Sequence, residues 1–157
     1  MIRSATPADI SNILVLIHDL AEYERARQEV QATPATLHDA LFGEHPSVFC
    51  DVAEVDGEIV GFALWFLSFS TWLGQHGIYL EDLYVHPSQR GAGIGRALLV
   101  RLAQRCVEQG YGRLEWSVLD WNAPALGFYR ALGAEPMDEW TVHRLSGPEL
   151  AHLGRSA

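Results

Sequence analysis

The sequence predicts a mixed α/β fold in which a mostly antiparallel central sheet carries helices on both faces. Three observations support this prediction. Apolar residues recur at a helical period after the N-terminus, strand-like alternation covers much of 48–85, and a second helical period follows a glycine-rich segment. A helix that joins two strands implies one parallel connection within the sheet. We therefore expect a single domain over residues 1–157.

The first helix is expected to begin near Thr6, because threonine caps helices, Pro7 suits the first helical position and Asp9 can reach back to the cap. The buried stripe that follows is predicted to contain Ile10, Ile13, Leu14, Ile17, Leu20 and Ala21. Glu24 continues this row at the end of the helix. A second start signal, Thr33-Pro34, predicts a shorter helix.

The next segments predict strands, because runs of β-favouring residues are separated by turn signals. Strands are expected at 48–55, 58–69, 78–85, 113–119 and 139–145. The Asp56-Gly57 pair predicts a tight hairpin between the first two of these strands. One helix is expected from the glycine segment to about Glu108. Another is expected over 122–132, with Asn122 as its cap and Gly133 beyond its end.

The composition limits the classes of function. The formal net charge is −9 and all 11 basic residues are arginine, so Schiff-base chemistry and a P-loop lysine are excluded. The acidic balance argues against a nucleic-acid partner and favours a cationic one. No apolar run reaches the roughly 18–20 residues of a membrane helix and no signal peptide is apparent, so we expect a cytoplasmic protein without a membrane partner. The histidines lack metal-ligand spacing, so no metal site is expected.

A glycine-rich segment at 88–99, SQRGAGIGRALL, separates a predicted strand from a predicted helix. A dinucleotide fingerprint would need a further glycine where Arg96 stands. The pattern R-x-x-G-x-G fits instead, with Arg90, Gly93 and Gly95. The backbone amides of this segment and the helix N-terminus would bind a pyrophosphate, with both arginines adding positive charge. The alternative is a glycine-rich turn that binds nothing.

Two motifs give the chain a family resemblance. The segment LYVHPSQRGAGIGRALL resembles the acetyl-CoA-binding motif of the GCN5-related N-acetyltransferases, and DWNAPALGFYRALGA resembles the second part of that signature. The resemblance covers nearly the whole chain and implies the fold of that family, with acetyl-CoA as cosubstrate. The cofactor-binding residues that it implies are Leu83, Tyr84, Val85, Arg90, Gly91, Ala92, Gly93, Ile94, Gly95, Arg96, Asn122, Pro124, Phe128 and Tyr129.

A narrower resemblance concerns the acceptor. The segments LAEYE, FGEHP and IVGFALWFLSFSTWLGQHGIYLEDLYV are similar to the diamine (spermidine/spermine) and thialysine acetyltransferase branch. This implies a primary amine of a small cationic acceptor, and a homodimer. The substrate-binding residues that it implies are Glu24, Trp72, Asp82, Glu139 and Trp140. Thr71 stands where polyamine-acting members tend to carry an acid, which favours a short acceptor over spermine.

The resemblance also implies catalytic roles. Tyr129 matches the tyrosine beside the acetyl-CoA sulfur and would protonate the leaving thiolate. An alkylammonium with a pKa of roughly 10 must lose a proton before it attacks, and Glu81 is implied as the proton acceptor. Glu81 and Asp82 are neighbours in a strand and should point to opposite faces.

Structural alternatives accompany these roles. Tyr129 would otherwise be a core aromatic, the two strand carboxylates would be ion pairs with arginine, and the acceptor residues would be solvated surface. Two other functions stay open: acetylation of a protein or peptide amine, and a CoA-binding sensor that does not catalyse.

Overall fold

The computed structural model describes residues 1–156 of the chain. These residues form two compact units, Met1–Leu119 and a second unit that begins at Asp120. The expectation of one domain over residues 1–157 stays a prediction.

The first unit contains a five-stranded sheet with the order β1-β2-β3-β4-β5. Its strands are β1 (Ile2–Ser4), β2 (Phe49–Val55), β3 (Glu58–Ser70), β4 (Gln75–Val85) and β5 (Leu114–Trp116). The pairs from β1 to β4 are antiparallel, and β5 runs parallel to β4. The predicted mixed and mostly antiparallel sheet is therefore confirmed, with β5 shorter than the strand expected at 113–119.

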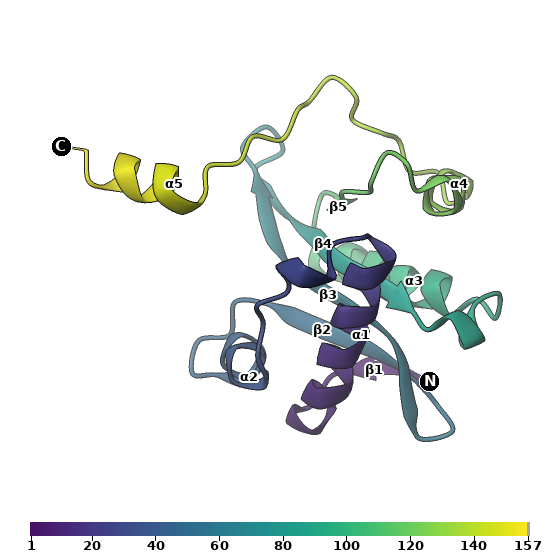
Figure 1. The fold of residues 1–157 in the computed structure, drawn as a ribbon. Helices are drawn as coiled ribbons and strands as arrows, with labels where there is room; N and C mark the ends of the chain where they lie inside the picture. Colours follow the sequence, from purple (N-terminus) through teal and green to yellow (C-terminus); the bar gives the residue numbers. More distant parts are fainter. Residues whose placement is uncertain (157) are drawn as a thin grey trace. The chain divides into compact units, whose positions relative to one another are not determined.

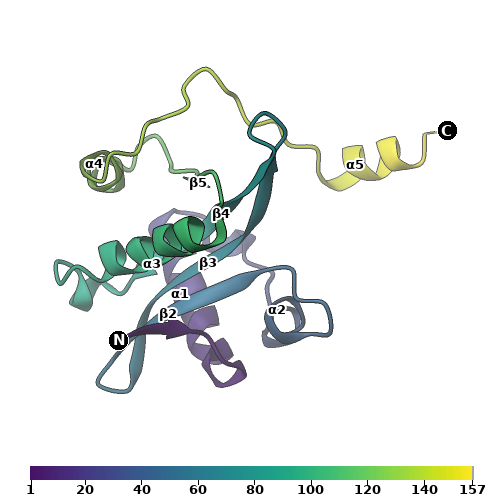
Figure 2. The ribbon, with the colours of Figure 1, turned by 180° about the vertical axis from the view of Figure 1, so that it is seen from behind.

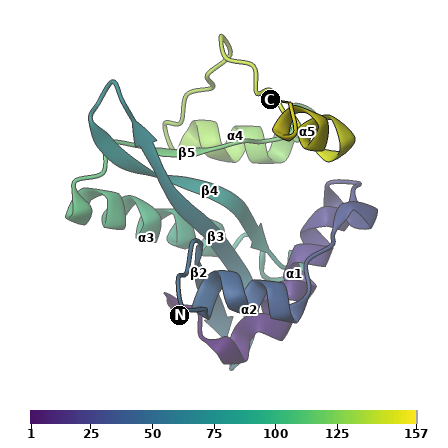
Figure 3. The same cartoon turned by 90° about the vertical axis from the view of Figure 1, so that its left-hand side faces the viewer.

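Helices cover both faces of this sheet, as predicted. Helix α1 (Ile10–Tyr23) crosses one face (Figure 1), and helix α3 (Ile94–Gln109) lies along the other (Figure 2). The side view shows the long twisted hairpin of β3 and β4 between these helices (Figure 3). Helix α2 (Pro34–Phe42) packs with α1, and the core on that side is formed by Ile13, Leu16, Leu41, Cys50, Val52, Phe62, Leu64 and Tyr84. Both cysteines are free and buried.

Local signals position the elements as expected. The Asp9 carboxylate accepts hydrogen bonds from the backbone N–H of Thr6 at 2.7 Å and from its hydroxyl at 3.0 Å. The hairpin between β2 and β3 turns at Asp56 and Gly57, whose φ angles are 51° and 84°. Positive φ at both central residues is typical of the type I′ turn that joins twisted strands tightly.

The second unit contains helix α4 (Ala123–Ala131) and helix α5 (Gly147–Gly154). The Asn122 side chain caps α4 by accepting a hydrogen bond from Ala125 N–H at 3.3 Å. The prediction of a strand at 139–145 is wrong, because residues 141–146 form neither helix nor strand. The segment keeps an extended, partly apolar pattern, but a strand also needs hydrogen bonds from a neighbouring strand, and the described part of this unit contains none.

Candidate active site

A bulge in β4 determines where its carboxylates point. Asp82 lies opposite Leu64 of β3, whereas Leu80 lies opposite Trp65, so Glu81 is one extra residue in the ladder. Directly opposed residues share a face of the sheet. Leu64 belongs to the core on the α1 side, while Trp65 faces α3, whose Arg105 guanidinium lies 4.9 Å from the indole ring centre. The bulge therefore turns Asp82 toward α1.

Three carboxylates gather at this point of the first unit. Glu24 follows the last residue of α1 and is half-buried, as is Asp82, while Glu81 is exposed. Burial raises the pKa of Asp82 to about 7, and the negative charges of Glu81 and Glu24 add to this rise. Burial and the charge of Glu81 also raise the pKa of Glu24. The three side chains are thus close enough to repel one another, and the simple alternation expected for Glu81 and Asp82 fails at the bulge.

None of these three carboxylates has an ion-pair partner among residues 1–156. The alternative of an arginine partner for Glu81 or Asp82 is therefore not what the structure shows. Carboxylates that are partly buried and repel one another favour a bound cation or a shared proton. The arrangement can bind an ammonium group and take a proton from it.

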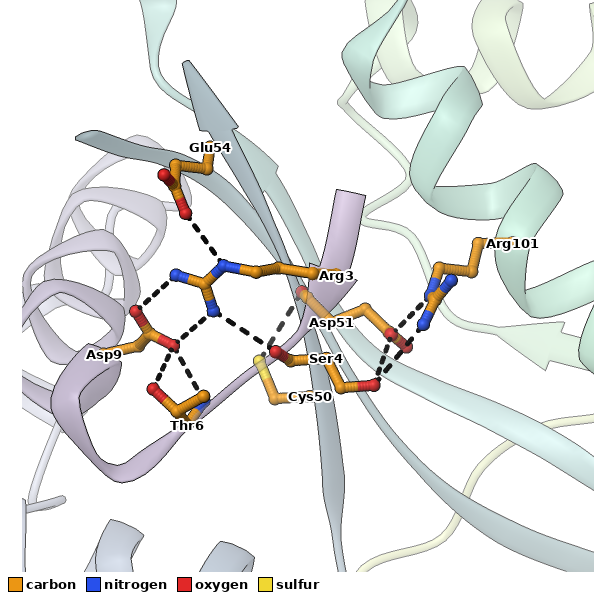
Figure 4. Close-up of polar contacts among 8 residues, drawn as sticks. All are labelled: Arg3, Ser4, Thr6, Asp9, Cys50, Asp51, Glu54 and Arg101. Atoms are coloured by element: carbon orange, nitrogen blue, oxygen red, sulfur yellow. Dashed lines mark hydrogen bonds and ion pairs between the residues drawn. The ribbon is translucent and has the colours of Figure 1, made fainter. Parts of the chain in front are cut away.

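Three other acidic residues of the first unit, Asp9, Asp51 and Glu54, are paired with arginine (Figure 4). Arg3 donates to both oxygens of Asp9, at 2.7 and 2.9 Å, and to Glu54 at 2.8 Å. These bonds hold the pKa of Asp9 at about 2. Asp51 of β2 is 1% exposed and accepts from Arg101 at 2.7 Å and from the indole N–H of Trp65 at 3.1 Å.

One edge of β4 is open beside the three carboxylates. β5 pairs only with Ile78–Leu80, so residues 81–85 of β4 have β3 on one side and no paired strand on the other within the first unit. Predicted cofactor residues Leu83 and Val85 lie on this open stretch. Their backbone groups can pair with an extended ligand as a strand would. The side chain of Tyr84 is 7% exposed and belongs to the core.

The glycine segment forms a loop that ends at the N-terminus of α3. Gly91 and Gly93 have φ angles of 84° and 79°, a conformation that other residues rarely adopt. A Cβ at either position would meet no atom within 4 Å, so the surface beside both is open. No side chain caps α3 at its first turn, where Ile94, Gly95 and the exposed Arg96 lie. Such a loop and helix N-terminus together suit a phosphate group.

The guanidinium of Arg90 packs against two tyrosine rings, whereas the sequence predicts that it adds positive charge beside a phosphate. Its guanidinium carbon lies 5.4 Å from the ring centre of Tyr23 and 5.3 Å from that of Tyr84. Its Nε donates a hydrogen bond to the carbonyl oxygen of Val85 at 2.9 Å. Sequence reasoning missed Tyr23, because no local signal joins the end of α1 to a loop more than sixty residues later.

The remaining predicted residues lie away from this cluster or in the second unit. Trp72 is 86% exposed in the turn between β3 and β4. In the second unit, Phe128 and Tyr129 are half-buried neighbours on α4 with ring centres 5.4 Å apart. Also in that unit are Asn122, Pro124, Glu139 and Trp140. The roles that the resemblance implies for these residues stay predictions.

The described residues contain neither a membrane-spanning helix nor a cluster of metal ligands. No helix among them is both long and apolar enough to cross a membrane. No group of three or more histidine, cysteine, aspartate or glutamate side chains within residues 1–156 is arranged to hold a metal ion.

Known proteins are similar to this chain in sequence and fold. The model of the acetyltransferase (GNAT) family matches residues 13–134. A thialysine N-epsilon-acetyltransferase of Bos taurus is 41% identical over 164 residues, which cover 98% of this chain and 96% of the relative. An L-ornithine N5-acetyltransferase of Arabidopsis thaliana is 30% identical and is covered over 87% of its length, with 98% of this chain aligned. An integron cassette protein from the mobile metagenome of V. cholerae has a solved structure with a TM-score of 0.83 and 27% identity, covering 99% of this chain and 98% of its own.

Proposed function

The chain belongs to the acetyltransferase (GNAT) family and is an N-acetyltransferase, and on this premise we propose that it acetylates a primary amine of a short cationic acceptor. Enzymes of this family use acetyl-CoA as cosubstrate. The acceptor is a diamine or an amino acid with a lysine-like side chain. The observation that carries this proposal is the cluster of Glu24, Glu81 and Asp82, which has no arginine partner among residues 1–156.

The cluster favours a cationic acceptor on electrostatic grounds. Two of its three carboxylates, Glu24 and Asp82, are half-buried, and burial raises the pKa of each. The negative charge of Glu81 adds to both rises, and that of Glu24 adds to the rise at Asp82. A bound ammonium group would offset this repulsion, whereas an anionic acceptor would increase it. The formal net charge of −9 attracts the same kind of molecule over a longer range.

The attacking amine must lose a proton, and the structure favours Asp82 as its acceptor over the Glu81 that the resemblance implies. A general base works best when its pKa lies near the working pH, and that of Asp82 is about 7. Asp82 is also held in a half-buried position by the bulge, whereas Glu81 is exposed. In this proposal the negative charge of Glu81 helps to raise the pKa of Asp82.

Transfer of the acetyl group requires the donor beside this cluster. The open edge of β4 and the glycine loop follow Asp82 directly in the chain. We assign the backbone of Leu83 and Val85 to the pantetheine arm and the amides of 91–95 to the pyrophosphate. The neutral amine nitrogen forms a bond to the thioester carbonyl carbon and the bond from that carbon to sulfur breaks. Tyr129 donates its phenolic proton to the leaving thiolate, and the proton lost by the acetylated nitrogen restores the phenol.

The length of the acceptor is a separate part of the proposal. Thr71 supplies no charge beside Trp72, so a second or third distant ammonium group has one fewer partner there. The relatives named for thialysine and ornithine also act, by name, on amino acids with one short aminoalkyl side chain. Both facts favour a short acceptor over spermine.

The test is a panel of amines incubated with the protein and acetyl-CoA. Release of the CoA thiol and the mass of the product are followed for thialysine, ornithine, lysine, 1,3-diaminopropane, spermine, an N-terminal peptide amine and an aminoglycoside. We expect the highest kcat/KM for a short acceptor and at least a tenfold lower value for spermine. Turnover of the peptide alone, or tight CoA binding without turnover of any amine, would contradict the proposal and support the peptide enzyme or the sensor.

Oligomeric state and location complete the proposal. We propose a homodimer, because Leu67, Phe69 and Trp72 near the β3–β4 turn are 40%, 58% and 86% exposed, and exposed apolar clusters commonly mark interfaces. Light scattering would then give twice the chain mass of 17.5 kDa. We also propose a cytoplasmic location, which the free thiols of Cys50 and Cys106 support.

A further inference from the structure

A recess lies between the end of α1 and the loop that follows β4. Its volume is about 300 Å³, and it is lined by Asp19, Glu22, Tyr23, Tyr84, His86, Pro87 and Arg90. The recess therefore joins three parts of the first unit: the last turns of α1, the end of β4 and the first residues of the glycine loop. Arg90 comes immediately before Gly91, where the backbone first adopts a positive φ.

The side chain of Arg90 connects these three parts. Its guanidinium packs over the rings of Tyr23 and Tyr84, at 5.4 and 5.3 Å, and its Nε bonds to the Val85 carbonyl at 2.9 Å. An arginine over an aromatic face gains from the ring quadrupole and from stacking of its planar group. We call these three side chains, Arg90, Tyr23 and Tyr84, the Arg90 latch.

The latch contains residues that are one and two positions away from acceptor carboxylates. Tyr23 precedes Glu24 in the chain, and Tyr84 lies two residues after Asp82 on the same strand. Tyr84 is 7% exposed and fixed in the core, whereas Tyr23 is 38% exposed at the last residue of α1. A change in the position of Arg90 therefore acts most directly on Tyr23 and, through the backbone, on Glu24.

We propose that Arg90 is a positioning residue that couples the pyrophosphate loop to the acceptor carboxylate Glu24, so that donor and acceptor strengthen each other's binding. The proposal rests on the proposed function and adds how its two binding regions communicate. Arg90 acts through the loop and through Tyr23 rather than as a phosphate ligand. Because coupling free energies are reciprocal, CoA raises the affinity for the amine by the same factor as the amine raises the affinity for CoA.

The first measurement is the affinity for CoA, which needs no knowledge of the acceptor. Calorimetry compares the wild type with Arg90→Met, Tyr23→Leu and the double variant. We expect each single variant to bind CoA about fivefold more weakly, and the double variant to be no weaker than either, because both remove the same contact. Tyr23→Phe keeps the ring and should bind CoA as the wild type does.

The second measurement is the affinity for thialysine with and without saturating CoA, a pair that cannot react. We expect CoA to strengthen thialysine binding about fivefold or more in the wild type and in Tyr23→Phe. The increase should fall below twofold in Arg90→Met and Tyr23→Leu. Arg27→Met is a matched control, because Arg27 pairs with Glu22 on the surface at 2.7 Å and does not touch the glycine loop. It should keep the full increase.

The outcomes separate the latch from the proposed function. If Tyr23→Leu binds CoA like the wild type while Arg90→Met binds it tenfold more weakly, Arg90 is a direct phosphate ligand and the latch is wrong. If CoA leaves thialysine binding unchanged in the wild type, the coupling is wrong although acetylation can still occur. If thialysine does not bind at all, thialysine is not an acceptor of this enzyme, and the CoA measurements alone decide whether the latch exists.

Discussion

Two groups of carboxylates in the first unit differ in what surrounds them. Asp9 and Asp51 are buried and each accepts hydrogen bonds from arginine, at 2.7 Å in the shortest case for both. Glu24, Glu81 and Asp82 lie near one another and have no ion pair among residues 1–156. The pKa of Asp9 is lowered to about 2, whereas that of Asp82 is raised to about 7.

This difference separates structural charges from functional ones. A buried carboxylate that is matched by arginine stays ionised and holds elements together, here β1, the start of α1 and α3. A partly buried carboxylate among others of the same sign costs stability and is retained where a ligand or a proton completes it. The comparison therefore predicts opposite effects when the two kinds of aspartate are changed to asparagine.

The largest expected effect is on catalysis. Asp82→Asn removes the proposed proton acceptor without changing its size, so kcat/KM for the preferred amine should fall about 10²–10³-fold. Glu81→Gln is the matched comparison and should lower it by less than tenfold, because Glu81 is exposed. A larger loss in Glu81→Gln than in Asp82→Asn would restore Glu81 as the base.

The next effect is on stability. Asp51→Asn leaves Arg101 and Arg105 of α3 without their carboxylate, so the free energy of unfolding should fall by about 2–3 kcal/mol. Both arginines are partly exposed, which limits the loss. Urea unfolding measures this change, and activity per folded molecule should stay within twofold of the wild type. A fully stable Asp51→Asn protein would show that the pairing contributes little.

The two groups of carboxylates should affect the pH dependence of stability in opposite ways. Since the pKa of Asp9 is lowered to about 2, its contribution to stability is complete above pH 4 and is lost as the pH falls toward 2. The raised pKa of Asp82 has the opposite effect on stability. Its contribution to the free energy of unfolding declines as the pH rises from about 4 to about 7. Asp9→Asn should abolish about 1–2 kcal/mol of the acid-side loss, measured by thermal unfolding between pH 2 and pH 5. An unchanged acid limb would contradict the pairing with Arg3.

The smallest expected effect concerns acceptor binding. Glu24→Gln keeps the shape of the side chain but removes one charge of the cluster, so KM for a short amine should rise about fivefold with little change in kcat. The same substitution should lower the pKa of Asp82, because one of the charges that raises it is gone. An unchanged KM would place the acceptor elsewhere.

Local signals in the sequence predicted most of the fold. The Thr6–Asp9 capping box before α1, the Asp56-Gly57 turn and the glycines before α3 each depend on a few adjacent residues, and all three are confirmed. The wrong strand at 139–145 shows the limit, because an extended pattern does not reveal whether a neighbouring strand exists. The strand expected at 113–119 is longer than the observed β5 (Leu114–Trp116), because the pattern does not reveal which residues pair with β4.

The site was predictable in its residues and less so in its geometry. Glu24, Glu81 and Asp82 were all expected, and the structure brings them together. The bulge that turns Asp82 toward α1 has no sequence signal, because it depends on the register with β3. The sequence also does not predict the partners of Arg90 and Asp51, because these partners lie on distant segments that only the fold brings close.

The central claim is that Asp82 takes the proton from the acceptor, and the pH dependence of kcat/KM tests it most directly. Because a raised pKa of about 7 leaves Asp82 partly protonated at neutral pH, kcat/KM should rise with pH through about 7 in the wild type. It should then fall as the free amine loses its own proton near pH 10. In Asp82→Asn the rise near pH 7 should disappear. A rise at the same pH in both proteins would contradict the account.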